Sequence, residues 1–384
     1  MKKKSLVAKE STHGGFFGGF SQLVKITATD PGLTLNPNES RITANSCHPV
    51  LWMMVLFVMQ SLFVPSSFAQ ATTQLIDERI SLYRKAYPEI EFKLLHSKAD
   101  FDQLLPLTSS LGKDLRNVDY EHPESARITL VEAQEYRIAL QLKNCNGTAT
   151  LFKTPNARIT NKPYTCLVAL NIPLLDESSL AASRFMYDMD DAALSSLSES
   201  YLFDNQDFLV NSIDHEVFHC IDAYANGYLF PMTLDPVKSS LDRSRAELRA
   251  EIFSAMAHLN RQPNGKRFLL NQATARTLSL LSGDVEHYTS GALIMLVGSS
   301  KQNDTYDIKT LVKKSMRLAE DHAASYAEHK EFLVDLRIVL EDFDIDTDTL
   351  FTEYPDLADD VPSDKNVESL RNVINIAISD IHTK

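Results

Sequence analysis

Residues 214–222 read Asp-His-Glu-Val-Phe-His-Cys-Ile-Asp, and the apolar residues around them follow a helical pattern. Four residues make about one helical turn, so His215 and His219 would project from the same side of that helix. Two imidazoles one turn apart can bind a single metal ion, and Glu216 would lie beside that ion rather than beneath it. The motif therefore predicts a zinc site in which Glu216 is the base that activates a water molecule.

A zinc site with an open coordination position needs a third protein ligand. In the metzincin pattern this ligand lies six residues past the second histidine, but that residue is Ala225. The other common arrangement takes a glutamate from the next long helix, and residues 245–253 offer Glu247 and Glu251, one turn apart. We expect Glu247 to be the ligand and Glu251 to hold a zinc histidine by a hydrogen bond. Glu251 lies closer to the apolar stripe of its helix, which leaves the reverse assignment open.

Two further residues of the motif helix carry predictions. Asp222 falls on the same face as the two histidines. We expect its carboxylate to orient one of them, and a charge on the helix surface is the alternative interpretation. Cys220 is expected to be a small packing residue rather than a ligand.

The sequence at 215–229, followed by Glu-Leu-Arg-Ala-Glu-Ile-Phe at 247–253, resembles the catalytic domain of the anthrax lethal-factor-like metallopeptidases, which are gluzincins. The similarity includes the aspartate three residues past the second histidine, a nearby tyrosine and the Glu-x-x-Ala-Glu-x-Phe helix. The resemblance implies a zincin-like fold and Glu216 as the general base. The zinc ligands that it implies are His215, His219 and Glu247. It covers residues 215–253 of the 384, so it supports the class of protein more than the substrate.

One position departs from that family, which places a tyrosine seven residues before the ligand glutamate to stabilise the oxyanion. The residue here is Ser240. The donor must then come from elsewhere or be missing. His287 and Tyr288 are the catalytic candidates downstream, while Tyr224 and Tyr228 lie nearer the motif. Ordinary polar residues at the start of a helix are the alternative for the downstream pair.

The N-terminal region predicts export. Residues 51–64, LWMMVLFVMQSLFV, have the length of a signal-peptide core and fall short of the roughly 20 apolar residues of a membrane-spanning helix. Small residues at Ser67 and Ala69 predict cleavage after Ala69, with cleavage after Ala71 as the nearest alternative. An uncleaved signal anchor is the other interpretation. We expect a periplasmic or extracellular protein that meets the membrane only through its leader.

The formal net charge of −13 argues against a nucleic-acid partner, because neutralising phosphates needs a basic surface. A peptide or protein substrate is the partner that the motif predicts. The sequence makes no prediction of the oligomeric state.

The first half of the chain contains the candidate strands and disulfide. Cys145 and Cys166 bracket a segment with turn signals that is typical of a β-hairpin. An oxidising compartment would allow the two cysteines to pair, and two unpaired buried thiols are the alternative. Residues 164–171 carry no charge and fit either an edge strand that aligns a peptide by backbone pairing or an interior strand.

The residue pattern changes from mixed to helical along the chain. Residues 71–171 combine a helix at 73–86 with strands at 90–95, 127–131, 136–143 and 165–171. Helices are expected afterwards at 206–225, 239–260, 265–282, 306–321, 325–342 and 366–382. We expect an α+β, zincin-like fold, with a small sheet in its N-terminal part and a mostly helical C-terminal part. Its expected regions are a leader at 1–69, a metallopeptidase domain at 70–300 and a helical region at 301–384.

Two functions fit these patterns. The first is an exported zinc metallopeptidase that hydrolyses peptide bonds by Glu-assisted attack of zinc-activated water. The second is a non-catalytic, zinc-stabilised binding module of the cell envelope. The departure at Ser240 favours the second function. The presence of Glu216 favours the first, because a purely structural zinc site needs no base and prefers four protein ligands.

Overall fold

A computed structural model describes residues 67–95, 147–153, 162–170, 178–226, 235–299, 305–347, 351, 354, 357 and 360–382. Leu75–Lys384 belong to one compact unit, and residues 67–74 belong to a second. The predicted strands at 127–131 and 136–143, together with Cys145, Tyr228 and residues 1–66 of the leader, lie outside the described residues.

The described part of the chain is mostly helical, and the coarse α+β prediction is confirmed. The helices are α2 (Ser67–Ala86), α7 (Ala181–Tyr187), α8 (Asp191–Leu194), α9 (Asn205–Asn226), α10 (Pro236–Arg261), α11 (Lys266–Leu278), α12 (Ser290–Ser299), α13 (Ile308–His322), α14 (Tyr326–Asp342) and α16 (Asp364–His382), with short 3-10 helices η2 (Glu199–Tyr201) and η3 (Ser279–Ser282). Every helix predicted after residue 205 is present. The predicted helix at 265–282 is divided into α11 and η3.

A mixed sheet of three strands, in the order β1-β3-β2, precedes the helices. Strand β1 (Ile90–Leu95) pairs with β3 (Tyr164–Leu170) in parallel, with Ile90 opposite Tyr164. Strand β2 (Gly147–Lys153) pairs with β3 in antiparallel register, which confirms the predicted hairpin. Because β3 lies between the other two, the edge-strand prediction for residues 164–171 is wrong and its alternative, an interior strand, is correct. The apolar side chains of β3 explain this position, because they are buried on both faces.

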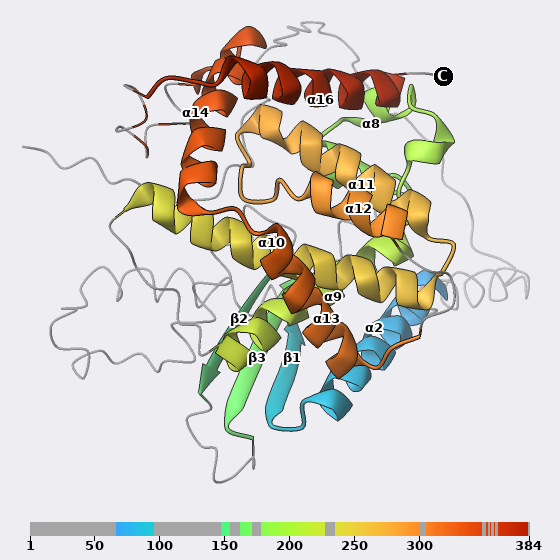
Figure 1. The fold of residues 1–384 in the computed structure, drawn as a ribbon. Coiled ribbons are helices and arrows are strands. Elements are labelled where there is room, and N and C mark those ends of the chain that lie inside the picture. Colours follow the sequence, from blue (N-terminus) through green and yellow to red (C-terminus); the bar gives the residue numbers. More distant parts are fainter. Residues whose placement is uncertain are drawn as a thin grey trace, which may run out of the picture. The chain divides into compact units, whose positions relative to one another are not determined.

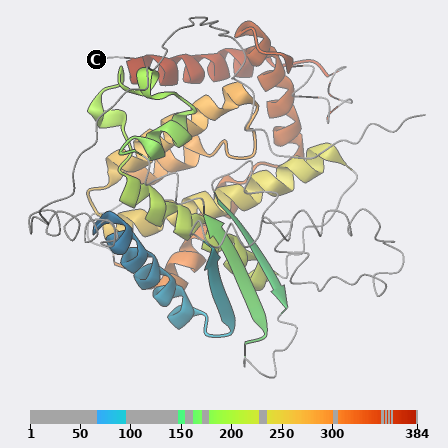
Figure 2. The same ribbon diagram turned by 180° about the vertical axis from the view of Figure 1, so that it is seen from behind.

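The motif helix α9 packs on the sheet, and α10 lies alongside it (Figure 1). Seen from behind, the strands lie in front of α9 (Figure 2). Four alanines along α10 are buried and let its backbone approach its neighbours: Ala246, Ala250, Ala255 and Ala257. Between α9 and α10, the rings of Phe218 and Phe253 stack with centroids 4.8 Å apart. These contacts fix the rotation of both helices about their axes, which determines which side chains meet.

A disulfide joins Cys166 of β3 to Cys220 of α9, with the two Cα atoms 5.8 Å apart. The predicted pairing of Cys145 with Cys166 is therefore wrong, and so is the assignment of Cys220 to packing alone. Both sulfurs are buried, because the inner face of β3 lies against α9. The bond ties the motif helix to the central strand one residue after His219.

Removal of this disulfide is expected to lower the free energy of unfolding by about 2–5 kcal/mol, since the bond closes a loop between residues 54 positions apart. Cys166→Ala, measured by urea unfolding of the oxidised protein, tests this. Cys145→Ala is the matched control and should leave stability nearly unchanged. An equal loss in both variants would show that Cys166 pairs with Cys145 instead.

Apart from the apolar core around the sheet, α9 and α10, a second apolar cluster lies between α14, α16 and the segment after η3, with Leu333, Leu336, Leu340 and Ile374 fully buried.

The sequence prediction did not include α12 because this helix is apolar on all sides and has no amphipathic pattern. None of the described helices combines the length and apolarity that crossing a membrane requires.

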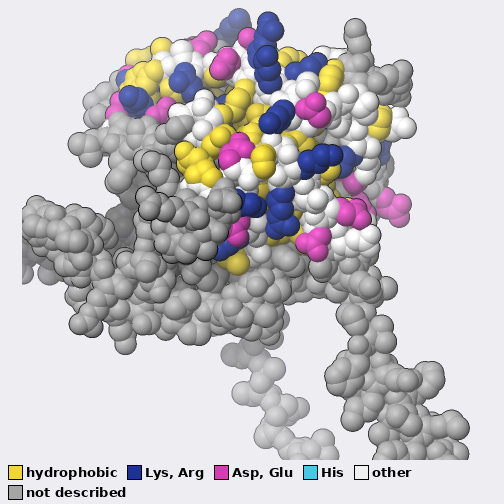
Figure 3. Space-filling view, turned by 90° about the horizontal axis from the view of Figure 1, so that it is seen from below, with side chains coloured by type: hydrophobic (Ala, Val, Ile, Leu, Met, Phe, Trp, Pro, Cys, Tyr) yellow, Lys and Arg dark blue, Asp and Glu magenta, His cyan; other side chains and the backbone are white. Residues whose placement is uncertain are grey.

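The surface charge is not uniform despite the net charge of −13. The face shown in Figure 3 carries Lys and Arg side chains, with Asp and Glu side chains among them, around a group of apolar side chains. The exposed side of α13 is basic over about two and a half turns, with Lys309, Lys313, Lys314 and Arg317. Acidic side chains therefore dominate the composition without covering every face.

Candidate metal centre

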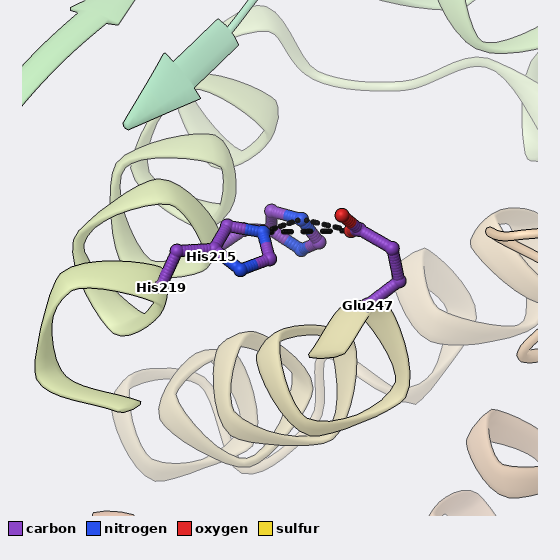
Figure 4. Close-up of side chains that lie close together, drawn as sticks. All are labelled: His215, His219 and Glu247. Carbon is purple, nitrogen blue, oxygen red and sulfur yellow. Dashed lines mark hydrogen bonds and ion pairs between the residues drawn. The ribbon is translucent and has the colours of Figure 1, made fainter. Parts of the chain in front are cut away.

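Three side chains from α9 and α10 converge at one point (Figure 4). His215 and His219 lie one turn apart on α9, and their Nε2 atoms are 3.1 Å apart. Glu247 of α10 places Oε2 at 2.9 Å from Nε2 of His215 and 3.5 Å from Nε2 of His219. Among the described residues, this is the one group of three such side chains whose ligand atoms all lie within 4.8 Å of one another. The group could hold a metal ion.

The separations between these three atoms suit a tetrahedral zinc ion. Zinc binds imidazole nitrogen and carboxylate oxygen at about 2.0–2.2 Å, and two donors at a tetrahedral angle then lie about 3.3–3.5 Å apart. The observed separations of 2.9, 3.1 and 3.5 Å need only small side-chain adjustments to reach those values. Two nitrogens and one oxygen are also a common zinc donor set, whereas calcium and magnesium prefer oxygen alone.

The electrostatics at this point favour a positive charge. Burial alone would lower the pKa of His215, but hydrogen bonding to Glu247 and Glu251 outweighs it and raises the pKa to about 10. For Glu247, burial would raise the pKa, but the imidazoles of His219 and His287 hold it well below its usual range. A group of carboxylates and imidazoles that stabilises a proton this strongly would also stabilise a bound cation.

Glu251 lies behind His215 rather than with the three converging atoms. Its Oε2 is 3.0 Å from Nδ1 of His215, on the opposite side of the imidazole from Nε2. Of the two glutamates, Glu247 is the one that belongs to the converging group, and Glu251 contacts the far side of the His215 imidazole. A carboxylate at Nδ1 selects the tautomer that presents the Nε2 lone pair.

Glu216 lies beside the converging atoms. Burial raises the pKa of its carboxyl group, the imidazoles of His215 and His219 oppose this, and the charge of Glu247 adds to it. Its carboxylate is half-buried on the same helix as the two histidines. The raised pKa makes this carboxylate a stronger base than that of an exposed glutamate.

Of the two downstream candidates, only His287 reaches the centre. Its Nε2 is 3.2 Å from Oε2 of Glu247, and its Nδ1 is 2.8 Å from Oδ1 of Asp284. Burial would lower the pKa of His287, but Asp284 and Glu247 raise it well above the usual value. Tyr288 instead stacks on Phe332 of α14, with ring centroids 5.3 Å apart. The expectation that Tyr288 lies at the site is therefore not met.

Asp222 has a different partner from the one expected. Arg249 of α10 donates to its Oδ2 through Nη2 and Nε at 2.7 and 2.9 Å, and Asn226 donates to its Oδ1. The carboxylate is buried, so the surface-charge alternative does not hold either. Asp222 joins the two site-bearing helices to each other instead of orienting a histidine.

Ser240, the position of the expected tyrosine, is fully buried on α10, and its hydroxyl lies 3.1 Å from Nε2 of His329 on α14. Its side chain thus faces another helix and not the three converging atoms. A tyrosine at this position would have to fit inside the interface of α10 and α14. The ring nitrogen that does lie at the converging group is Nε2 of His287, 3.2 Å from Oε2 of Glu247, and the spacing of residues along α9 and α10 alone does not select it.

Asp214 anchors the start of the motif. Its carboxylate is completely buried and accepts hydrogen bonds from Arg79 and Tyr83 of α2 and from Arg261 of α10. Burial would raise its pKa, but the two arginines lower it. The residue before His215 is thereby held by two other helices. Sequence patterns gave no signal of these contacts, which join residues between 47 and 135 positions apart.

Comparison with protein-family models, with curated proteins and with solved structures finds no match to this chain. Statements about its activity therefore depend on the geometry of its own residues.

Proposed function

We propose that this protein is an exported zinc metallopeptidase with a zincin-like catalytic domain, which hydrolyses peptide bonds. The observation that carries the proposal is the convergence of Nε2 of His215, Nε2 of His219 and Oε2 of Glu247, with Glu216 beside them. A bound zinc ion would supply a Lewis acid that acidifies water and polarises the peptide carbonyl. Three ligands, rather than four, leave a coordination position for substrate.

The roles of the chain's own residues follow from their positions. Glu216 takes a proton from the attacking water and returns it to the amine nitrogen that leaves. His287 donates from Nε2 to the carbonyl oxygen, where negative charge develops. Asp284 accepts from Nδ1 of His287 at 2.8 Å and, with Glu247, raises the pKa of the imidazole, so that both ring nitrogens carry a proton and Nε2 can donate.

The buried disulfide supports the export part of the proposal. Such bonds form and persist in oxidising compartments and are rare in the cytosol of most cells. Because Cys166 and Cys220 lie in the interior, reductants would reach them only through local opening. N-terminal sequencing of the exported protein tests the predicted cleavage sites, which fall in the first two turns of α2.

The alternative, a non-catalytic zinc-stabilised module, has less support. Its main argument was the missing tyrosine at position 240, and His287 offers a donor in its place. The non-catalytic alternative also gives no reason for a half-buried Glu216 beside a three-ligand group.

The test of the proposed function is peptide hydrolysis: purified, zinc-loaded protein should cleave members of a mixed peptide library, and a chelator should abolish cleavage.

His287→Ala is expected to reduce kcat by about 10²–10³-fold, which is typical for loss of one oxyanion donor. Zinc affinity should change much less, because His287 is not one of the three converging ligands. Steady-state hydrolysis beside a zinc titration separates the two quantities. His322→Ala on the exposed end of α13 is the matched control. Full activity in His287→Ala would remove this residue from the mechanism.

A further inference from the structure

Helix α11 contributes none of the three converging atoms. Two of its side chains contact Glu251, the residue that lies behind His215. Arg276 of α11 donates from Nε to Oε1 of Glu251 at 2.7 Å, and its Nη2 lies 3.3 Å from Oε2. Gln272, one turn earlier on α11, donates to the same Oε1 at 2.9 Å. A chain of contacts therefore runs from α11 through Glu251 to His215.

Glu251 has little freedom in this arrangement. The residue is 1% exposed, so a carboxylate there requires a compensating charge and hydrogen bonds. Arg276 supplies the charge, and its planar fork reaches both carboxylate oxygens, which fixes the plane of the carboxylate. Nε of Arg276 and Gln272 contact Oε1, while Oε2, which Nη2 of Arg276 also reaches, lies 3.0 Å from Nδ1 of His215.

From these contacts we infer that Arg276, assisted by Gln272, is a positioning residue for the metal ligand His215. The inference rests on the proposed metal site and adds a third helix to it. Arg276 acts through Glu251: it holds the carboxylate in the plane that accepts the Nδ1 proton, so that the Nε2 lone pair faces the metal. Loss of the arginine would let the carboxylate turn and the imidazole with it.

The test measures zinc affinity by competition with a chelating dye, using the full mature chain. Arg276→Gln should weaken zinc binding by about 10–100-fold, the usual effect of removing a partner of a metal ligand. Arg276→Lys retains the buried positive charge, and hence the fold, but an ammonium cannot reach both oxygens. It should weaken binding several-fold, less than Arg276→Gln. Arg267→Gln, an exposed arginine on the same helix, is the control and should have no effect.

A double-mutant cycle separates positioning from a general effect on folding. If Arg276 acts through Glu251, adding Arg276→Gln to Glu251→Gln should not weaken zinc binding further. The absorption bands of bound Co²⁺ should shift in Arg276→Gln and not in Arg267→Gln, because they report ligand geometry. Urea unfolding of each metal-free variant shows how much stability is lost independently.

The outcomes distinguish the two proposals. Wild-type protein that binds no zinc would overturn both the metal site and the positioning role. Zinc binding that is equally tight in wild type, Arg276→Lys and Arg276→Gln would overturn the positioning role and leave the metal site standing. A further tenfold loss on adding Arg276→Gln to Glu251→Gln would also overturn it, because the arginine would then act by another route.

Discussion

Glu216→Gln is expected to reduce peptide hydrolysis by about 10²–10⁴-fold, the usual contribution of a general base. The substitution keeps the size of the side chain and removes its ability to accept a proton from water. Because Glu216 is not one of the three converging ligands, zinc affinity should stay within about twofold of wild type. Initial rates on a cleaved peptide, beside a zinc titration, measure both quantities.

The matched control for this substitution is Glu368→Gln, an exposed glutamate on α16. It should leave hydrolysis unchanged. Unchanged hydrolysis in Glu216→Gln would contradict the proposed mechanism even if zinc were bound. Loss of hydrolysis together with loss of zinc would instead show that Glu216 is needed to assemble the site.

The second large effect concerns the third ligand. Glu247→Ala should weaken zinc binding by more than the roughly 10–100-fold expected when a supporting carboxylate such as Glu251 is removed. The reason is geometric: Oε2 of Glu247 lies among the converging atoms, whereas Oε2 of Glu251 lies behind His215 at its Nδ1. Metal content by elemental analysis and zinc affinity of Glu247→Ala and Glu251→Ala give the comparison.

Glu320→Ala, an exposed glutamate on α13, is the control and should bind zinc as wild type does. A larger loss in Glu251→Ala than in Glu247→Ala would reverse the two assignments. Equal, small losses in both would mean that zinc is held by the histidines with some other group.

The local part of the fold and site was predictable from sequence. The spacing of His215 and His219 depends only on the pitch of one helix, and the apolar period located α9, α10, α13 and α14. The hairpin of β2 and β3 followed from turn residues between two short apolar runs. In each case the determining interactions lie within a few residues of one another.

The remaining features depend on how distant elements dock. Strand order is a property of the sheet, so the sequence of residues 164–171 could not distinguish an edge from the centre. Cys220 looked like a packing residue because its partner, Cys166, lies 54 positions away on another element. The choice between Glu247 and Glu251 depended on the rotation of α10 against α9, which the buried alanines and phenylalanines set.

Asp222 and Tyr288 illustrate the same limit. Helix periodicity put Asp222 on the face of the histidines, but the partner that captures it, Arg249, comes from α10. Tyr288 follows His287 directly in sequence, and the two side chains end in different surroundings, one at Glu247 and the other on Phe332.

The anchoring of Asp214 has a practical consequence for producing the protein. Arg79 and Tyr83 lie only about ten residues beyond the predicted cleavage sites, so a recombinant chain that starts after residue 83 would lack both. Asp214, which precedes His215 of the converging group, would then keep Arg261 as its one arginine partner among these contacts. Recombinant material truncated in this way would report on a damaged centre, and a negative activity assay with it would carry no weight.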